Sequence, residues 1–180
     1  MNNRYKGDTG TDCLLSVDGT DCPIWKSGPR WWSHKFKKSG VRYELGVAIH
    51  SGDIASIHGP YPCGEYNDIK IFRLGLKHDL DEGERVKADL GYAGDSSVKV
   101  PGPLYVNKKY RAVKRDVAAR HETVNMRIKI FNCLTQKFRH SVDKHSMCFR
   151  ALAVLTQLAI ERGEPLYSVE YSDDYEVYAN

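Results

Sequence analysis

The segment that most restricts the fold is residues 41–49, where side chains alternate between apolar and polar or small. Val41, Tyr43, Leu45, Val47 and Ile49 take the odd positions, and the even ones are Arg42, Glu44, Gly46 and Ala48. Successive side chains of a β-strand point to opposite faces, so this period of two predicts a strand with one face in the core. Ser51-Gly52 predicts a turn into a further strand at 54–58, which forms an antiparallel hairpin and ends at Gly59-Pro60.

Other segments predict the remaining elements. Residues 13–18 indicate a short strand with Asp18 at its carboxyl end, and residues 86–89 indicate a fourth strand ending at Asp89. Asn67-Asp68 is typical of the start of a capped helix of two or three turns. Glycines and prolines predict a loop over 91–103, followed by a short strand around 104–106.

Two helices are predicted in the carboxyl-terminal part. The first runs from Asp116 to Phe138, and its apolar stripe consists of Val117, Val124, Ile128, Phe131, Leu134 and Phe138. The second runs from His145 to Arg162 and ends at Gly163, with a buried face made of Phe149, Leu152, Leu155 and Leu158.

This element order predicts an α/β fold with a mixed sheet flanked by helices. It would put Asp18 and Asp89 on neighbouring strands, facing Glu122 on a helix, which is an RNase H-like layout. A chain of 180 residues suits one core, so we expect one domain at 13–171, an extension at 1–12 and an acidic tail at 172–180.

Several classes of protein are excluded. No apolar run approaches the roughly 18 residues that span a bilayer, and the amino terminus lacks a signal-peptide pattern, so we expect a soluble intracellular protein without a membrane partner. The five cysteines include no Cys-x-x-Cys pair, which argues for reduced thiols and against a structural zinc site. We expect His121, His140 and His145 to pack or to contact phosphate rather than to bind metal.

Net charge is only +4, but two segments, 26–42 and 108–120, are strongly basic. Such clusters are either solvated loops or surfaces that bind phosphate. We predict nucleic-acid contacts for ten of their cations, namely Lys35, Lys37, Lys38, Arg42, Lys108, Lys109, Arg111, Lys114, Arg115 and Arg120. Trp31, Trp32 and His34 lie among the lysines and could stack on bases or belong to the core.

Asp18, Asp89 and Glu122 together suggest a metal site. Carboxylates are the hard oxygen ligands that Mg²⁺ and Mn²⁺ prefer, and two ions roughly 3.5–4 Å apart can clamp a phosphodiester. Taken singly, each aspartate could be a turn residue and Glu122 an ordinary surface acid. Asp21 competes with Asp18 for the role, and Asp68 and Asp95 are candidate supporting acids.

The ordered set of motifs resembles the Harbinger-type DDE transposases and the nucleases derived from them, over about residues 13–171. The matching stretches are Asp18-Gly-Thr-Asp-Cys-Pro-Ile24, Lys35-Phe36-Lys37, Val41-Arg42-Tyr43-Glu44, Gly59-Pro60, Asn67-Asp68, Ile71-Phe72-Arg73, Ala88-Asp89-Leu-Gly91-Tyr92 and Arg-His-Glu122. The resemblance implies an RNase H-like core in which Asp18, Asp89 and Glu122 are the catalytic triad and bind two divalent ions, Mg²⁺ or Mn²⁺.

The resemblance also implies a metal-dependent DNA endonuclease that hydrolyses phosphodiester bonds and could transfer strands, located in the nucleus. Family members carry an amino-terminal DNA-binding segment, whereas seventeen residues precede Asp18 here. End recognition could therefore depend on a separate DNA-binding partner protein, and self-association is a further option. The alternatives are a catalytically inert, transposase-derived DNA- or protein-binding domain and an enzyme that acts on RNA or RNA–DNA hybrid.

Overall fold

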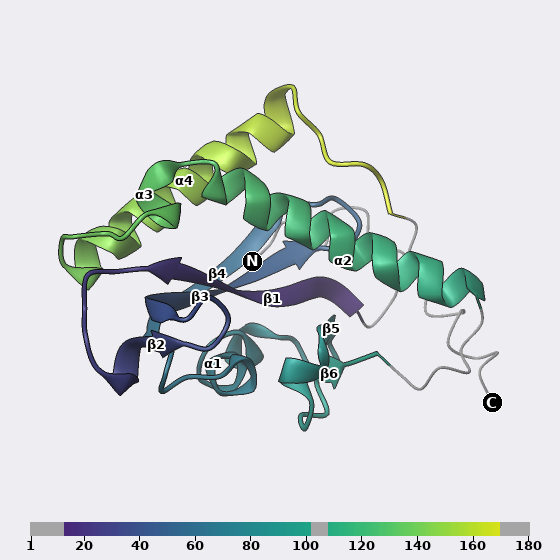
Figure 1. The fold of residues 1–180 in the computed structure, drawn as a ribbon. Coiled ribbons are helices and arrows are strands. Elements are labelled where there is room, and N and C mark those ends of the chain that lie inside the picture. The colour runs from purple at the N-terminus through teal and green to yellow at the C-terminus, as the bar shows by residue number, and fades with distance from the viewer. Residues whose placement is uncertain (1–12, 102–107, 170–180) are drawn as a thin grey trace.

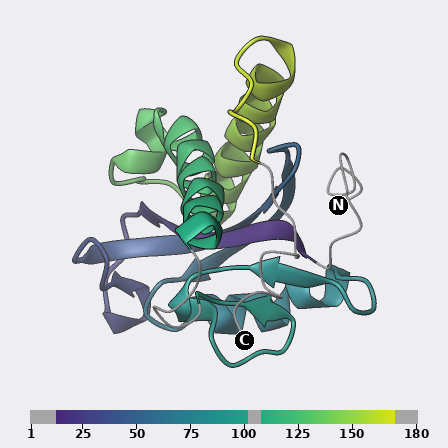
Figure 2. The same cartoon turned by 90° about the vertical axis from the view of Figure 1, so that its right-hand side faces the viewer.

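The computed structural model describes residues 13–101 and 108–169, and for residues 108–114 only the backbone. Its centre is a six-stranded mixed sheet with helices on both faces. Figures 1 and 2 show α2 and α4 on one face and α1 on the other. The predicted α/β class with a mixed sheet flanked by helices is confirmed.

Antiparallel and parallel pairing meet at the central strand, β1 (Cys13–Pro23). On one side, β1 pairs antiparallel with β3 (Lys38–Ala48), which pairs antiparallel with β4 (Ile54–Pro62). On the other side, β1 pairs parallel with β5 (Arg85–Lys87), which pairs parallel with β6 (Val98–Lys99). The two-residue β2 (Trp32–Ser33) pairs with the start of β3. The strands predicted to carry or precede Asp18 and Asp89 are therefore neighbours.

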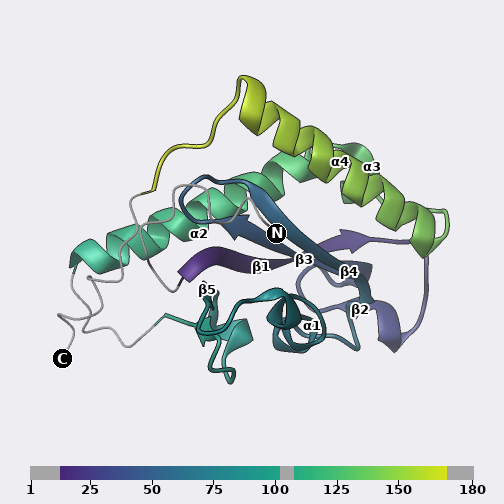
Figure 3. The same ribbon diagram turned by 180° about the vertical axis from the view of Figure 1, so that it is seen from behind.

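Two apolar clusters fill the space between the sheet and its helices. One lies against α2 (Lys108–Lys129) and α4 (Val142–Arg162) and includes Tyr43, Val124 and Phe149. The other lies against α1 (Asp68–Leu74) and includes Val17 and Phe72. Figure 3 shows the long helices from behind, where α4 crosses β4 while α2 runs along β1.

The first strand is longer than predicted, so Asp18 lies in its middle and not at its end. Pairing with β3 continues past Asp18, from Gly19 opposite Glu44 to Pro23 opposite Gly40. The backbone hydrogen bonds of this long pairing keep β1 extended through the polar residues that ended the apolar pattern. Asp89, in contrast, comes just after β5, as the end of β5 at Lys87 shows.

The predicted hairpin is confirmed, but Gly59-Pro60 does not end its second strand. β4 runs on to Pro62 and tolerates this pair through an irregular register opposite Arg42 and Glu44. At the turn, Gly52 adopts φ +79°, a conformation that glycine accepts readily. The structure also has the short strand β6 inside the predicted loop 91–103, whereas the strand expected at 104–106 lies outside the described residues.

The predicted helix 116–138 is in fact interrupted. α2 ends at Lys129, a separate turn α3 (Asn132–Thr135) follows, and Phe138 forms a parallel bridge with Ile24 beyond the end of β1. Val124, Ile128 and Leu134 are buried as predicted. Apolar residues keep a helical spacing across the break because α3 and Phe138 contact the same core cluster as α2.

The second long helix starts at Val142, earlier than predicted, because Ser141 caps it by accepting a hydrogen bond from the Lys144 amide at 3.3 Å. Its predicted buried face was partly wrong. Phe149 is buried, but Leu155 is 52% exposed and Leu158 36% exposed. The face that packs on the sheet consists of His145, Phe149, Ala153, Thr156 and Ile160. No helix in the described ranges is both long and apolar enough to cross a membrane.

Candidate active site

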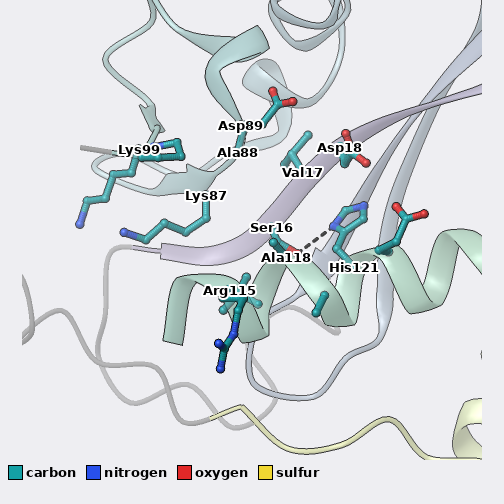
Figure 4. Close-up of a pocket in the computed structure, with 14 residues that line it drawn as sticks. Ser16, Val17, Asp18, Lys87, Ala88, Asp89, Lys99, Arg115, Ala118 and His121 are labelled. Atoms are coloured by element: carbon teal, nitrogen blue, oxygen red, sulfur yellow. Dashed lines mark hydrogen bonds between the residues drawn. The ribbon is translucent and has the colours of Figure 1, made fainter. Parts of the chain in front are cut away.

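Three acidic side chains from distant segments line one cavity of about 510 Å³ between β1, the segment after β5, and α2. They are Asp18, Asp89 and Glu122. Figure 4 shows the Asp18 and Asp89 carboxylates at one end of the cavity, away from Lys87 and Lys99. The fold thus brings the three predicted acids to a common surface.

Asp18 is the most enclosed of the three acids. One carboxylate oxygen accepts a hydrogen bond from the Gly19 amide at 2.8 Å, and the other accepts one from Asn125 Nδ2 on α2 at 3.2 Å. Burial raises the pKa of Asp18 to about 6, Lys35 and the Gly19 amide offset part of that rise, and the carboxylates of Asp89 and Asp68 add to it. Asp18 therefore lies in a place where negative charge is poorly compensated.

Asp89 is exposed and held by the turn that follows it. Its side chain caps the 3₁₀ helix Leu90–Tyr92 by accepting a hydrogen bond from the Gly91 amide at 2.8 Å. Tyr92 holds this turn in place, because its side chain is fully buried against Phe72. One carboxylate oxygen of Asp89 is thus engaged locally, and the group stays accessible from solvent.

Glu122 lies on the exposed side of α2, next to a histidine that fixes the helix on the sheet. His121 is buried, and its Nδ1 lies 2.9 Å from the hydroxyl oxygen of Ser16 on β1, the contact dashed in Figure 4. Burial lowers the pKa of His121 to about 4, so the ring is neutral at physiological pH. This contact sets the position of α2 along β1 and thereby places Glu122 beside the cavity.

A fourth carboxylate, Asp68 at the start of α1, lies between the segments that carry Asp18 and Asp89. A Cβ atom on Gly19 would lie 2.3 Å from Asp68 Oδ1, and one on Gly91 would lie 3.0 Å from Asp68 Oδ2. Both positions therefore favour glycine. The Asn67 cap correctly predicted the start of this helix, but only the packing of α1 under the sheet shows where the Asp68 side chain lies.

The other acids considered have structural partners. Asp21 accepts hydrogen bonds from Arg42 at 2.6 Å and from Ser33 at 2.6 Å, and these bonds lower the pKa of Asp21 against the opposing effect of burial. Asp95 pairs with Lys77 at 2.8 Å and with Arg73 at 3.3 Å. Asp21 lines a second cavity beside Asp18, but its carboxylate is already occupied by Arg42.

Two of the predicted phosphate contacts do not fit the structure. Arg42 is buried, with Asp21 on one side and Asp68 Oδ1 3.1 Å from its Nη1 on the other. Arg120 is also buried and donates a hydrogen bond to the Ala48 carbonyl oxygen at 3.0 Å. A buried guanidinium that already has partners cannot reach a DNA backbone, so the prediction that these two arginines contact phosphate is corrected.

The structure describes the side chains of only some of the remaining cations that were predicted to contact phosphate. Lys35, Lys37, Lys38 and Arg115 are exposed, and Arg115 lines the cavity of the three acids. The side chains of Lys108, Lys109, Arg111 and Lys114 lie outside the described residues.

Trp31 packs against the core, whereas Trp32 is 41% exposed. His145 is buried and contacts the Tyr43 hydroxyl at 2.8 Å, as expected for a packing histidine, whereas His140 is exposed.

The acids suit a divalent cation by their chemistry. In the part of the chain that the structure describes, no three His, Cys, Asp or Glu side chains gather closely enough to surround one ion. The three carboxylates instead line different parts of one cavity. They are hard oxygen donors, and the raised pKa of Asp18 reflects a desolvated negative charge that a cation would compensate.

Comparison with known proteins assigns the chain to a family. No curated protein matches the chain. A family model described as DDE superfamily endonuclease matches residues 17–157, a range that includes all three acids and extends from β1 into α4. Because the match covers well over half of the sequence, the chain belongs to the DDE superfamily endonuclease family.

Proposed function

We propose that this chain is a metal-dependent DNA endonuclease of Harbinger-type transposase origin. The observation that carries the proposal is that Asp18, Asp89 and Glu122, which lie far apart in the sequence, line one cavity. The sheet order, with an antiparallel meander joined through β1 to two parallel strands, is compatible with an RNase H-like fold. The proposed substrate is DNA, and the proposed location is the nucleus.

The roles of the three acids follow from their surroundings. Asp18 is the most enclosed donor, held by Gly19 and Asn125, and Asp89 and Glu122 are accessible donors on either side of the cavity. When bound, Mg²⁺ or Mn²⁺ supplies a water of lowered pKa for attack on phosphorus and stabilises charge on the departing 3′ oxygen. Lys35, whose Nζ lies 3.2 Å from the Gly19 carbonyl oxygen, contributes positive charge near Asp18 for the approaching phosphate.

The first test measures metal binding by thermal unfolding with and without millimolar Mn²⁺. Binding to the native state stabilises it by about 2.7 kcal/mol at a hundredfold excess over the dissociation constant. We expect Mn²⁺ to raise the Tm of the wild type and to have no effect on Asp89→Asn. The matched control is Asp143→Asn, an exposed acid on α4, which should respond to Mn²⁺ like the wild type.

The second test measures cleavage of duplex DNA and of RNA–DNA hybrid under the same conditions. We expect Mn²⁺-dependent cleavage of duplex DNA that is lost in Asp89→Asn. DNA binding without either a Tm shift or cleavage would contradict the proposal and favour the inert binding domain. Cleavage confined to the hybrid would instead assign the chain to RNA chemistry.

A further inference from the structure

A second cavity, also of about 510 Å³, begins at two of the same acids and extends along α2 toward the carboxyl end of the helix. Asp18 and Glu122 line both cavities, whereas Asp89 lines only the first. The other walls of the second cavity come from residues 19–21 of β1, from residues 35–36 and from the end of α2, where Asn125, Met126, Lys129 and the following Ile130 line it. The proposed catalytic acids thus lie where two cavities join, and we refer to the second one as the α2 groove.

The α2 groove has two cations. Lys35 reaches its edge from the loop before β3, and Lys129 reaches it from the end of α2. Neither lysine forms an ion pair with another residue of the described ranges. Lys35 also lies near enough to Asp18 and Asp21 to lower the pKa of each. Lysine charge beside the acids is suited to the phosphates of a strand whose scissile phosphate lies at Asp18.

The surface between these cations is apolar and unusually exposed. Met126 is 60% exposed and Ile130 is 72% exposed. Met126 follows Glu122 by four residues on α2, and Ile130 follows Met126 by four directly after the helix ends, so the three side chains form one stripe along α2 and its carboxyl end. Phe36, partly exposed, forms part of the opposite wall. Large apolar side chains at a charged surface suggest a ligand that has both apolar faces and negative charges.

Unpaired nucleotides have this combination. Their bases expose flat apolar faces, which stack or pack on apolar and aromatic side chains, while their phosphates remain anionic. In an intact duplex the same faces are stacked on one another, and only base edges and the backbone are accessible. We propose that the α2 groove binds a short unpaired segment of DNA next to the scissile phosphate.

The proposal rests on the proposed nuclease function for its location, but its test does not require catalysis. Fluorescence anisotropy in EDTA would compare binding of a labelled single-stranded DNA oligonucleotide and of the corresponding blunt duplex. We expect the wild type to prefer the single strand. The double variant Met126→Ser/Ile130→Ser should lose about tenfold in affinity for the single strand and change little for the duplex.

Lys129→Gln tests the phosphate contact separately. It should weaken binding and lower the slope of log affinity against log salt concentration by about 0.7 for the single strand. Matched controls on α4 are Lys144→Gln and Val154→Ser/Leu155→Ser, which alter exposed side chains of the same types and should bind like the wild type. All substitutions are at accessible positions, and thermal unfolding would verify the fold.

The results separate the two proposals. Equal affinity for single strand and duplex, or normal single-strand binding by Met126→Ser/Ile130→Ser, would overturn the groove proposal even if the wild type cleaves DNA with Mn²⁺. In that case the stripe on α2 would have another occupant, such as a protein segment. Single-strand preference that depends on the stripe, without any metal-dependent cleavage, would support the groove and contradict the nuclease function.

Discussion

Glu44 is a carboxylic acid enclosed within the fold, in the middle of β3. It is fully buried, and no hydrogen bond of ordinary geometry reaches either of its carboxylate oxygens from the described residues. Burial raises the pKa of Glu44 to about 8, the nearby Tyr92 hydroxyl offsets part of the rise, and the Asp68 carboxylate adds to it. Glu44 is therefore protonated in the native protein at neutral pH.

This raised pKa predicts a pH-dependent stability. Above about pH 4.5 the unfolded chain releases the Glu44 proton while the native state keeps it, so stability falls as pH rises until about pH 8. Glu44→Gln keeps the shape and removes the titration. Between pH 5 and pH 9, we expect the free energy of unfolding of Glu44→Gln to rise by a few kcal/mol relative to that of the wild type. Urea unfolding at both pH values measures this, and parallel curves for the two proteins would contradict it.

At the scale of elements, α4 shows how a helix can be identified from sequence while its packing face is misread. Leu152 packs on the core as predicted, but Leu155 and Leu158 are exposed, and the sheet contacts the face that contains His145 and Thr156. Two polar atoms on that face have partners: His145 Nδ1 lies 2.8 Å from the Tyr43 hydroxyl on β3, and the Thr156 hydroxyl donates to the Leu152 carbonyl oxygen at 2.8 Å. Such contacts make burial of polar side chains acceptable.

A pair of alanine substitutions tests this orientation. Phe149 is fully buried and stacks on Tyr43 with ring centroids 3.8 Å apart. Phe149→Ala should lower the free energy of unfolding by about 3–5 kcal/mol. Leu155→Ala, at a position 52% exposed, should change it by less than about 0.5 kcal/mol. Equal losses in urea unfolding would mean that the helix packs in the orientation predicted from sequence.

At the scale of the whole molecule, the reactivity of the cysteine thiols measures how completely the core excludes solvent. Cys22 and Cys63 are buried, and burial raises the pKa of Cys22 to about 12, whereas Cys133 is exposed. A reagent must reach the thiol, so exposure favours reaction at Cys133. We expect a thiol reagent to modify Cys133 in the native protein and to reach Cys22 and Cys63 only on unfolding.

Labelling followed by mass spectrometry of the peptides would measure each site. Cys133→Ser should remove the fast reaction of the Cys133 peptide and leave the slow reaction of Cys22 and Cys63 unchanged. If Cys22 reacted as quickly as Cys133 in the native protein, the core would not exclude solvent as one cooperative unit.

The sequence by itself determined the features that depend on neighbouring residues. The period of two over 41–49 predicted β3, Asn67 predicted the start of α1, and the glycine at 163 predicted the end of α4. These signals are local because backbone geometry alone sets the side-chain period and the unpaired amides of a helix end. Local sequence contexts and the family resemblance also predicted the three acids.

Tertiary structure decided what depends on distant partners. It extended β1 beyond Asp18 through pairing with β3, buried Arg42 between Asp21 and Asp68, and put Asp68 against Gly19. A cation in a basic segment has the same sequence pattern whether it faces solvent or an acid on another strand. Burial and pairing arise only when segments far apart in the sequence pack together, so no local pattern could have distinguished these cases.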